Sequence, residues 1–399
     1  MNILITGARG FIGKNLVERL KCIRDGKDTT RDYAPILPIN LLEYSHSQDK
    51  SELMEYCKTA DFVFNLAGVN RCNNPIDFKK GNVDFLNTLL AYLSESANSC
   101  EIVQASSIQA KLDGRFAGSE YGKTKLQAEE ILKVHQEKSG CNVYIFRLPN
   151  TFGKWQKPDY NSVVATFCNN IAADLPITID DPDVSLELLY IDDLIDAFID
   201  CLLGDVAVDS QGFCFNGITH NTTVGEVASI ITSFNNEIDR SQIAYEKPGS
   251  LEKKLHATYT SFLATNAKDK WHYDLTSHID ARGSFAELFK TPDRGQVSVN
   301  VSNPGVTKGQ HWHNTKWEKF CVVYGEGIIR QRKVGLDVNN KPYPVIEKAV
   351  SGEKPEVVET IPGYIHSLTN TSDTDIMVTI IWSNECFDPK RPDTFAEDV

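Results

Sequence analysis

A glycine-rich segment close to the amino end constrains the fold of this chain more than any other feature. Gly7-Ala-Arg-Gly10-Phe-Ile-Gly13 directly follows a short apolar run at 3–6, and a helical pattern begins near Phe11. Glycines at such a junction permit a tight turn and let a pyrophosphate approach the amino terminus of a helix. Three glycines can also be turn and packing residues, but their place between a strand and a helix predicts a dinucleotide-binding fold.

The apolar runs that follow support this prediction. Up to about residue 260, short runs rich in β-branched and aromatic residues alternate with longer amphipathic stretches, which is typical of a βαβ series. Each run is nearly continuous, as expected of strands buried on both faces. The predicted strands are 3–6, 36–40, 62–66, 101–105 and 143–148. We therefore expect a Rossmann-like, doubly wound parallel sheet with helices on both faces.

The pattern changes after residue 259. The predicted strands 297–301, 320–324, 327–332, 356–361 and 376–382 are separated by Gly, Pro, Asn and Asp turns, which is typical of an antiparallel barrel or sandwich. No strong periodic pattern crosses 265–274, and 399 residues exceed the usual length of one domain. We expect an α/β domain at 1–265, followed by an all-β domain at 275–399.

Composition limits the partners. The chain has 54 acidic and 41 basic side chains, a net charge of -13, which leaves no broad cationic face for nucleic acid. No run of 18 apolar residues and no signal-peptide pattern is present. The 10 cysteines form no CxxC pair, as expected of reduced, mostly buried thiols. We expect a cytoplasmic protein that binds neither nucleic acid nor a membrane.

A tyrosine and a lysine four residues apart are the strongest catalytic candidates. Tyr121-Gly-Lys-Thr-Lys125 places both side chains on one face at the start of a predicted helix. There the ammonium lowers the phenol's pKa, so that the phenol can exchange a proton near neutral pH. Ser106 and Ser107 end the preceding strand, where either hydroxyl can hydrogen-bond the same substrate oxygen. A purely structural Tyr/Lys pair is the alternative.

The choice of cofactor depends on the group that meets the 2' position of the adenosine ribose. NAD enzymes usually place Asp or Glu there, at the end of the second strand, where this chain has Asn40-Leu41. Arg9 stands inside the glycine loop and can pair with a 2'-phosphate. The sequence therefore predicts NADPH, with a solvated Arg9 as the alternative.

Together with Asp61-Phe-Val-Phe-Asn-Leu-Ala-Gly68, the GxxGxxG spacing resembles the extended, sugar-nucleotide branch of the short-chain dehydrogenase/reductase superfamily. The resemblance implies that Asp61 lies near the adenine, that Ala67 and Gly68 line the cofactor cleft, and that Ser107 rather than Ser106 is catalytic. The expected cofactor contacts are Gly7, Arg9, Gly10, Phe11, Ile12, Gly13, Asn40, Asp61, Ala67, Gly68, Tyr121 and Lys125.

Two later segments resemble the substrate region of the same branch. Arg147-Leu-Pro-Asn150 resembles the turn into the substrate domain, which implies that Asn150 lies near the nucleotide sugar. The branch often carries an arginine shortly before a later strand-to-helix junction, and this chain has Val184-Ser-Leu-Glu-Leu there instead. The recognition of the diphosphate therefore stays open at this stage.

A metal-ligand pattern lies in the second half. His311 and His313 alternate along one predicted strand and so share a face, and Glu318 follows after a turn. Between Gly305 and Gly325 the spacing matches the first cupin motif, G(x)5HxH(x)4E(x)6G. The segment at 362–370 resembles the second motif and implies His366 as the fourth ligand. By geometry alone this set suits zinc, iron, manganese or nickel.

A nucleotide-sugar reductase followed by a cupin resembles, over the whole chain, the CapF family of bifunctional enzymes of bacterial capsule biosynthesis. The resemblance implies that the cupin epimerises C3 of a UDP-4-keto-6-deoxy-N-acetylhexosamine. The reductase then reduces the C4 ketone with NADPH to UDP-N-acetyl-6-deoxy-L-talosamine, on the route to N-acetyl-L-fucosamine. We expect Zn²⁺, because epimerisation needs no redox change, and a homodimer.

Two alternatives remain. One is a non-catalytic sensor of NADPH and a sugar, which the presence of Ser107, Tyr121 and Lys125 disfavours. The other is a dehydrogenase fused to an iron dioxygenase. The base that removes the C3 proton is open among the side chains Lys316, Lys319, Tyr324 and His366.

Overall fold

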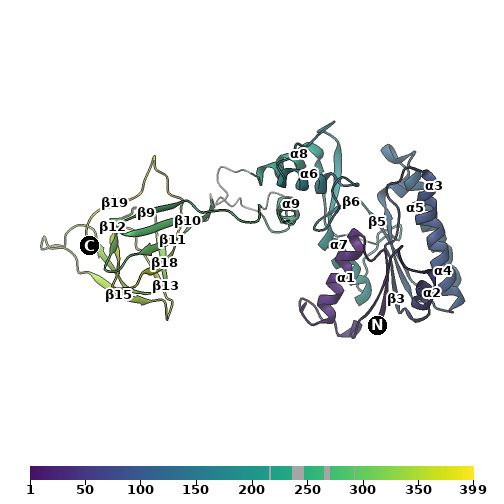
Figure 1. Cartoon of the computed structure of the whole chain (residues 1–399), viewed down its shortest axis with the longest axis horizontal. Helices are drawn as coiled ribbons and strands as arrows, with labels where there is room; N and C mark the ends of the chain where they lie inside the picture. The colour runs from purple at the N-terminus through teal and green to yellow at the C-terminus, as the bar shows by residue number, and fades with distance from the viewer. Residues whose placement is uncertain (215–216, 236–246, 265–269, 292) are drawn as a thin grey trace. The chain divides into compact units, whose positions relative to one another are not determined.

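The computed structural model describes the chain except for residues 215–216, 236–246, 265–269 and 292 (Figure 1). The described residues form two compact units, Met1–Asn235 with Pro248–Trp271 in the first and His272–Val399 in the second. The limits 1–265 and 275–399 stay predictions, because residue 265 lies outside the described residues.

A parallel sheet of five strands, in the order β2-β1-β3-β4-β5, forms the centre of the first unit. Its strands are β1 (Asn2–Thr6), β2 (Asn40–Tyr44), β3 (Phe62–Asn65), β4 (Glu101–Ser107) and β5 (Val143–Leu148). Four of them lie where the apolar runs predict them. The Rossmann-like prediction is therefore confirmed.

Helices cover both faces of this sheet (Figure 1). One face carries α1 (Phe11–Arg24) and α7 (Ile191–Leu203), and the other carries α2 (Lys50–Thr59), α4 (Phe85–Glu95) and α5 (Glu120–Ser139). Alternate residues of β1 serve the two cores, since Ile3 and Ile5 pack in one apolar cluster and Leu4 in the other. This double burial explains why the strands are continuously apolar.

The second strand differs from its prediction. The run predicted at 36–40 begins in a 3-10 turn, η1 (Ala34–Ile36), and β2 starts only at Asn40, which pairs with Asn2. Ile36 is buried in the core without being in a strand. β2 is an edge strand with one fully buried residue, Tyr44, so its own sequence is more polar than that of the run before it.

A smaller layer completes the first unit. Its sheet contains β6 (Asn150–Phe152), β7 (Ser185–Tyr190) and β8 (Thr219–Thr223), packed with α6 (Val163–Ala172), α8 (Val224–Ser233) and α9 (Leu251–Thr260) around a separate apolar core. The remaining short helices are α3 (Pro75–Lys79), η2 (Lys80–Asp84), η3 (Ile108–Lys111) and η4 (Gly114–Phe116). Within the described residues, no helix is long and apolar enough to cross a membrane.

The second unit is all-β, as predicted. One antiparallel sheet has the order β16-β13-β18-β11-β10-β9 and the other β15-β14-β17-β12-β19. The strands are β9 (Ser277–Asp280), β10 (Gly283–Thr291), β11 (Gly295–Ser302), β12 (Thr307–Trp312), β13 (Glu318–Tyr324), β14 (Glu326–Lys333), β15 (Ile346–Ser351), β16 (Val357–Glu359), β17 (Tyr364–Asn370), β18 (Met377–Ser383) and β19 (Phe395–Ala396).

The interior of this unit is unusually polar. Its apolar cluster is small, while Gln296, Ser298, Asn300 and Ser302, at alternate positions of β11, are all buried. These side chains satisfy one another, with Gln296 donating to Ser298 at 3.0 Å and Asn300 to Ser302 at 3.1 Å. These hydrogen bonds let β11 bury polar side chains in the interior of the unit.

Candidate active site and metal centre

The glycine loop has the geometry that a dinucleotide requires. Gly7 has a φ of +70°, and a Cβ there would lie 2.8 Å from the backbone nitrogen of Ala67. A Cβ on Gly13 would lie 2.2 Å from the carbonyl oxygen of Gly7. Gly10 is the N-cap of α1, so the first N–H groups of that helix face the loop. Glycines therefore bring the loop, the start of α1 and the segment Ala67-Gly68 together, as a bound pyrophosphate requires.

Two of the predicted cofactor residues lie at the amino ends of the strands, whereas the glycine loop follows the carboxyl end of β1. Asn40 pairs with Asn2 at the amino end of the strands. The carboxylate of Asp61 accepts the N–H of Asn2 at 2.6 Å, also at that end. Cofactors bind at the carboxyl ends of parallel strands, so both assignments were wrong. Asn40 begins its strand rather than ending it, and Asp61 stands before β3.

The residues that follow β2 at the carboxyl edge are Ser45, His46, Ser47 and Gln48. Nη1 of Arg9 lies 3.3 Å from Oγ of Ser47, which is 3.1 Å from Oγ of Ser45. A guanidinium beside two hydroxyls, with no carboxylate in this segment, is suited to a 2'-phosphate. Ser45 and Ser47 were not among the predicted residues, because the second strand ends at Tyr44 and not at Asn40. The polar residues directly after Tyr44 were the feature of the sequence that could have indicated this position.

A cleft of about 780 Å³ lies at the carboxyl edge of the parallel sheet. It is lined by the ends of β4 and β5, the start of α5 and the sheet that contains β6 and β7. Of the predicted residues, the structure brings together in its walls Phe11, Ile12, Gly68, Ser107, Tyr121, Lys125 and Asn150. The candidate cofactor loop and the candidate catalytic residues therefore face one cavity.

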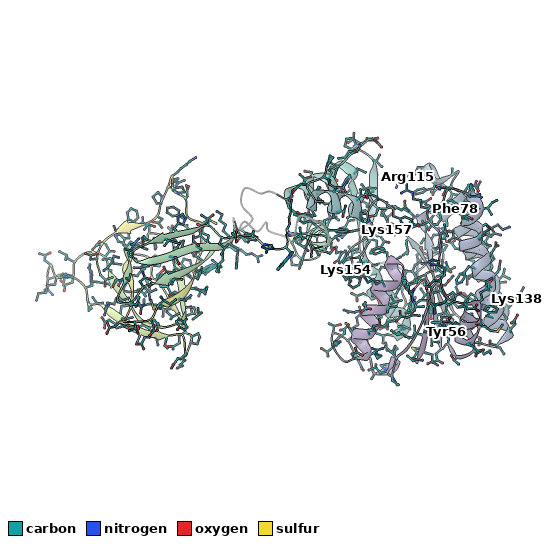
Figure 2. All side chains as sticks on the ribbon, viewed as in Figure 1. Tyr56, Phe78, Arg115, Lys138, Lys154 and Lys157 are labelled. Carbon is teal, nitrogen blue, oxygen red and sulfur yellow. The ribbon has the colours of Figure 1, made fainter. Side chains whose placement is uncertain are left out.

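The catalytic candidates come from β4 and α5. Tyr121 and Ser107 both line the cleft, and Nζ of Lys125 lies 5.7 Å from the centre of the Tyr121 ring. The ring of Phe78, labelled in Figure 2, lies 5.7 Å from that of Tyr121 and shields it. Ser106 turns away from this cluster, because its hydroxyl donates to Glu129 at 2.5 Å. The alternation along β4 thus sends Ser107, and not Ser106, toward the tyrosine.

Burial determines the protonation of this cluster. The sequence predicted a lowered pKa for Tyr121, but burial raises it to about 12, and hydrogen bonding with Ser107 opposes that change. Burial lowers the pKa of Lys125 to about 8, while the carboxylate of Glu129 opposes it. Glu129 is itself paired with Arg147 through contacts of 2.7 and 3.1 Å. Near neutral pH, Tyr121 therefore holds a proton that it can donate.

The four predicted metal ligands converge in the second unit. One ligand atom from each of His311, His313, Glu318 and His366 lies within 4.8 Å of those of the others. His311 and His366 are paired across β12 and β17, and Glu318 begins β13 of the facing sheet. The Nε2 atoms of His313 and His366 lie 3.6 and 3.4 Å from Oε2 of Glu318. Residues from both sheets of the second unit therefore form this four-residue cluster.

The donor set fits a divalent cation. Among the described residues, Nε2 of His313 and of His366 are buried without a hydrogen-bond partner, which is unusual for imidazole nitrogens unless they bind a ligand. Nδ1 of His313 faces the carbonyl oxygen of Asp393, which leaves Nε2 free to bind a cation. Burial, with His366 and His313 as neighbours, lowers the pKa of His311 to about 4, so this imidazole is neutral at pH 7.

The four candidates for the base that removes the C3 proton differ in their distance from the His/Glu cluster. Nζ of Lys316 lies 3.3 Å from Oε1 of Glu318, and His366 is itself a member of the cluster. Lys319 is paired with Glu359 at the surface, and Tyr324 is 55% exposed. Of the four candidates, Lys316 and His366 are therefore the two at the candidate metal centre.

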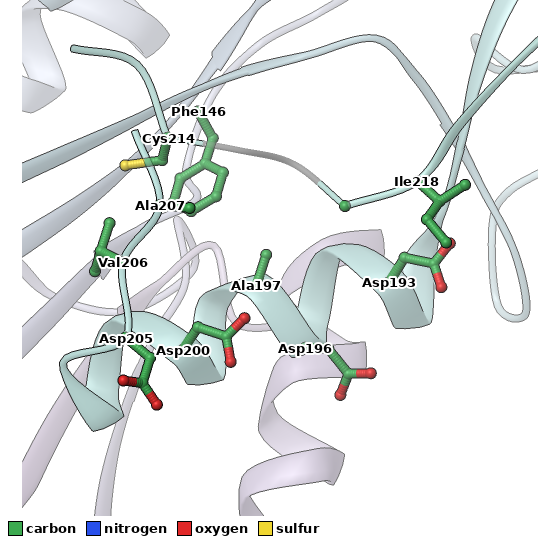
Figure 3. Close-up of a pocket in the computed structure, with 11 residues that line it drawn as sticks. Phe146, Asp193, Asp196, Ala197, Asp200, Asp205, Val206, Ala207, Cys214 and Ile218 are labelled. Carbon is green, nitrogen blue, oxygen red and sulfur yellow. The ribbon is translucent and has the colours of Figure 1, made fainter. Parts of the chain in front are cut away.

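A smaller hollow of about 220 Å³ contains none of the predicted site residues. Figure 3 shows Asp193, Asp196 and Asp200 along α7, with Asp205 just beyond it. Asp193 is paired with Lys254, Asp196 with Arg19, and Asp200 with Arg31. Since three of these four carboxylates have cationic partners, the larger cleft is the candidate active site.

Two family models match separate segments of the chain, one in each of the two units. Residues 3–210 match the NAD dependent epimerase/dehydratase family, and residues 278–395 match the polysaccharide biosynthesis C-terminal domain. A UDP-2-acetamido-2,6-beta-L-arabino-hexul-4-ose reductase of Pseudomonas aeruginosa is 39% identical over 406 residues, covering 100% of this chain and 99% of the relative.

Solved structures give the same result. The capsular polysaccharide assembling protein CapF from Staphylococcus aureus is 42% identical, with a TM-score of 0.85 and complete coverage of both chains. UDP-glucose 4-epimerase of Thermus thermophilus, in complex with NAD, is 17% identical with a TM-score of 0.52 over 66% of this chain and 99% of its own, so it shares the fold of the first unit. The chain therefore belongs to the NAD dependent epimerase/dehydratase family, in the CapF group that carries a polysaccharide biosynthesis domain at its carboxyl end.

Proposed function

We propose that this chain is a bifunctional UDP-sugar enzyme that epimerises C3 of a 4-keto-6-deoxy-N-acetylhexosamine and then reduces its C4 ketone. One observation carries this proposal: each unit has its own set of chemically competent side chains, Ser107, Tyr121 and Lys125 in the first, and His311, His313, Glu318 and His366 in the second. The relatives over the full length, a UDP-sugar reductase and CapF, support it.

In the reductase unit, Tyr121 holds the proton that moves onto the C4 oxygen, because its phenol is protonated near neutral pH. Ser107 orients that oxygen with its hydroxyl. Lys125 lies behind the phenol, where its charge stabilises the phenolate that remains after proton transfer. NADPH, when bound at the glycine loop, supplies the hydride. Arg9 with Ser45 and Ser47 would hold its 2'-phosphate.

In the epimerase unit, His311, His313, Glu318 and His366 would hold Zn²⁺, which suits a reaction without redox change. The cation would act as a Lewis acid toward the ketone. The C4 ketone acidifies the proton at C3, and reduction removes this activation. Epimerisation must therefore come first, and the product of both steps is UDP-N-acetyl-6-deoxy-L-talosamine.

Tyr121→Phe tests the reductase site. With a UDP-4-keto-6-deoxy-N-acetylhexosamine and NADPH, the rate of NADPH oxidation should fall by about 10²- to 10⁴-fold, because the general acid is lost. Exchange of the C3 proton with D₂O, followed by NMR, should continue. Tyr56→Phe, on α2 and labelled in Figure 2, is the control and should keep both reactions. Loss of both reactions in folded Tyr121→Phe protein would contradict independent sites.

Arg9→Ala tests the choice of cofactor. We expect wild-type protein to prefer NADPH over NADH in kcat/KM, and the variant to lose roughly tenfold or more of that preference, since a charge-assisted contact to the 2'-phosphate is removed. Arg24→Ala, at the other end of α1, should change neither value. A wild-type preference for NADH would refute the assignment.

The pH dependence of reduction follows from Lys125. Its pKa is lowered to about 8, so the ammonium is present below that pH and is lost above it. We expect kcat for NADPH oxidation to fall to about a tenth of its plateau near pH 9. The measurement is a pH profile of single-turnover reduction. A rate that stays level up to about pH 10 would show that the charge of Lys125 is not needed.

Removal of metal ligands tests the second centre. His313→Ala and Glu318→Ala should each lower metal affinity by orders of magnitude, because water must replace a protein ligand. If the cation takes part in C3 deprotonation, both variants should lose C3 exchange and keep reduction. Metal content, melting temperature and exchange are measured on the same preparations, with His278→Ala as a surface control. Full exchange by a folded, metal-free variant would exclude a catalytic metal.

A further inference from the structure

Few cations line the active-site cleft. Among the described residues in its walls, the cationic side chains are Arg71, Arg115 and Lys125, and the acidic one is Asp159. Nζ of Lys125 is buried and donates to the carbonyl oxygen of Ala105 at 2.9 Å. An anionic group of a ligand in this cleft therefore has the two arginines as its available cationic partners.

Arg115 reaches across the cleft to the segment where the family's usual arginine is absent. It lies in η4, and its Nη1 donates to the carbonyl oxygen of Ser185 at 3.1 Å. Ser185 begins β7, and Leu186 and Leu188 of that strand line the same cleft. A residue far away in sequence thus brings a guanidinium to the strand that has none of its own.

Arg71 contacts a different segment that lines the cleft, at Asp159 and Tyr160. Its Nη1 donates to the carbonyl oxygens of Tyr160 at 2.6 Å and of Asp159 at 3.2 Å. Two residues later, Ser162 is the N-cap of α6, and Val163 in its first turn faces the cleft. The guanidinium and the partial positive charge of the helix amino terminus therefore lie close together.

We infer that Arg71 and Arg115 bind the diphosphate of the nucleotide sugar, in place of the arginine that is absent from 184–188. This inference rests on the proposed function. Both side chains are exposed, so a ligand in the cleft can reach them. Their present partners are neutral carbonyl oxygens, and a diphosphate offers charged oxygens in the geometry that a guanidinium binds best.

The test compares the binding of UDP and uridine, which differ by the diphosphate alone. Dissociation constants are measured by calorimetry for wild type, Arg71→Gln, Arg115→Gln and the double variant. Lys138→Gln removes the same charge at the far end of α5, away from Arg115 in Figure 2, and is the control. The preference for UDP over uridine should fall about tenfold in each arginine variant. The affinities for uridine and NADPH should stay unchanged, which shows that the variants are folded.

The possible outcomes distinguish the assignment of the two arginines to the diphosphate from the proposed function. A wild-type protein that prefers UDP, with this preference intact in both arginine variants, would overturn the assignment and leave the proposed function standing. Equal losses for UDP and uridine would also overturn it, because the arginines would then support the cleft rather than bind the diphosphate. A wild-type protein that binds neither UDP nor uridine would contradict the proposed function itself.

Discussion

The parallel direction of the strands in the first sheet is the constraint on which the candidate active site depends. Because β1, β3 and β4 run the same way, whatever follows each of them meets at one edge. The glycine loop follows β1, Ala67 and Gly68 follow β3, and Ser107 ends β4. Buried helices on both faces hold this edge in place, so the candidate cofactor loop and the candidate proton donor face one cleft.

The convergence of the candidate site residues could be predicted from the sequence better than the position of each strand. The spacing of His311, His313 and Glu318 predicted that these side chains come together, as they do, although His313 lies just beyond the end of β12. Asn40 was misplaced because the second strand begins at this residue rather than ending there. Asp61 was assigned by resemblance, although it precedes β3 and therefore lies at the amino end of that strand. Ile36 misled the prediction because it is buried in a turn rather than in a strand.

Long-range partners had no signal in the sequence. Asp393 reaches His313 from a distant segment, and Arg115 reaches Ser185 in the same way. Such contacts depend on how the chain returns to itself, which local periodicity does not encode. Under the proposed function, both units use the same C4 ketone of the substrate. This ketone acidifies the C3 proton for epimerisation and accepts hydride in the reduction.

The central claim is that a single chain carries out both steps on one substrate, with epimerisation first. The most direct measurement is NMR of the product formed by wild-type protein from a UDP-4-keto-6-deoxy-N-acetylhexosamine and NADPH in D₂O. The account predicts deuterium at C3, taken from the solvent, and protium at C4, taken from the cofactor. A reduced product that retains protium at C3 would contradict it, because C3 would then never have been deprotonated.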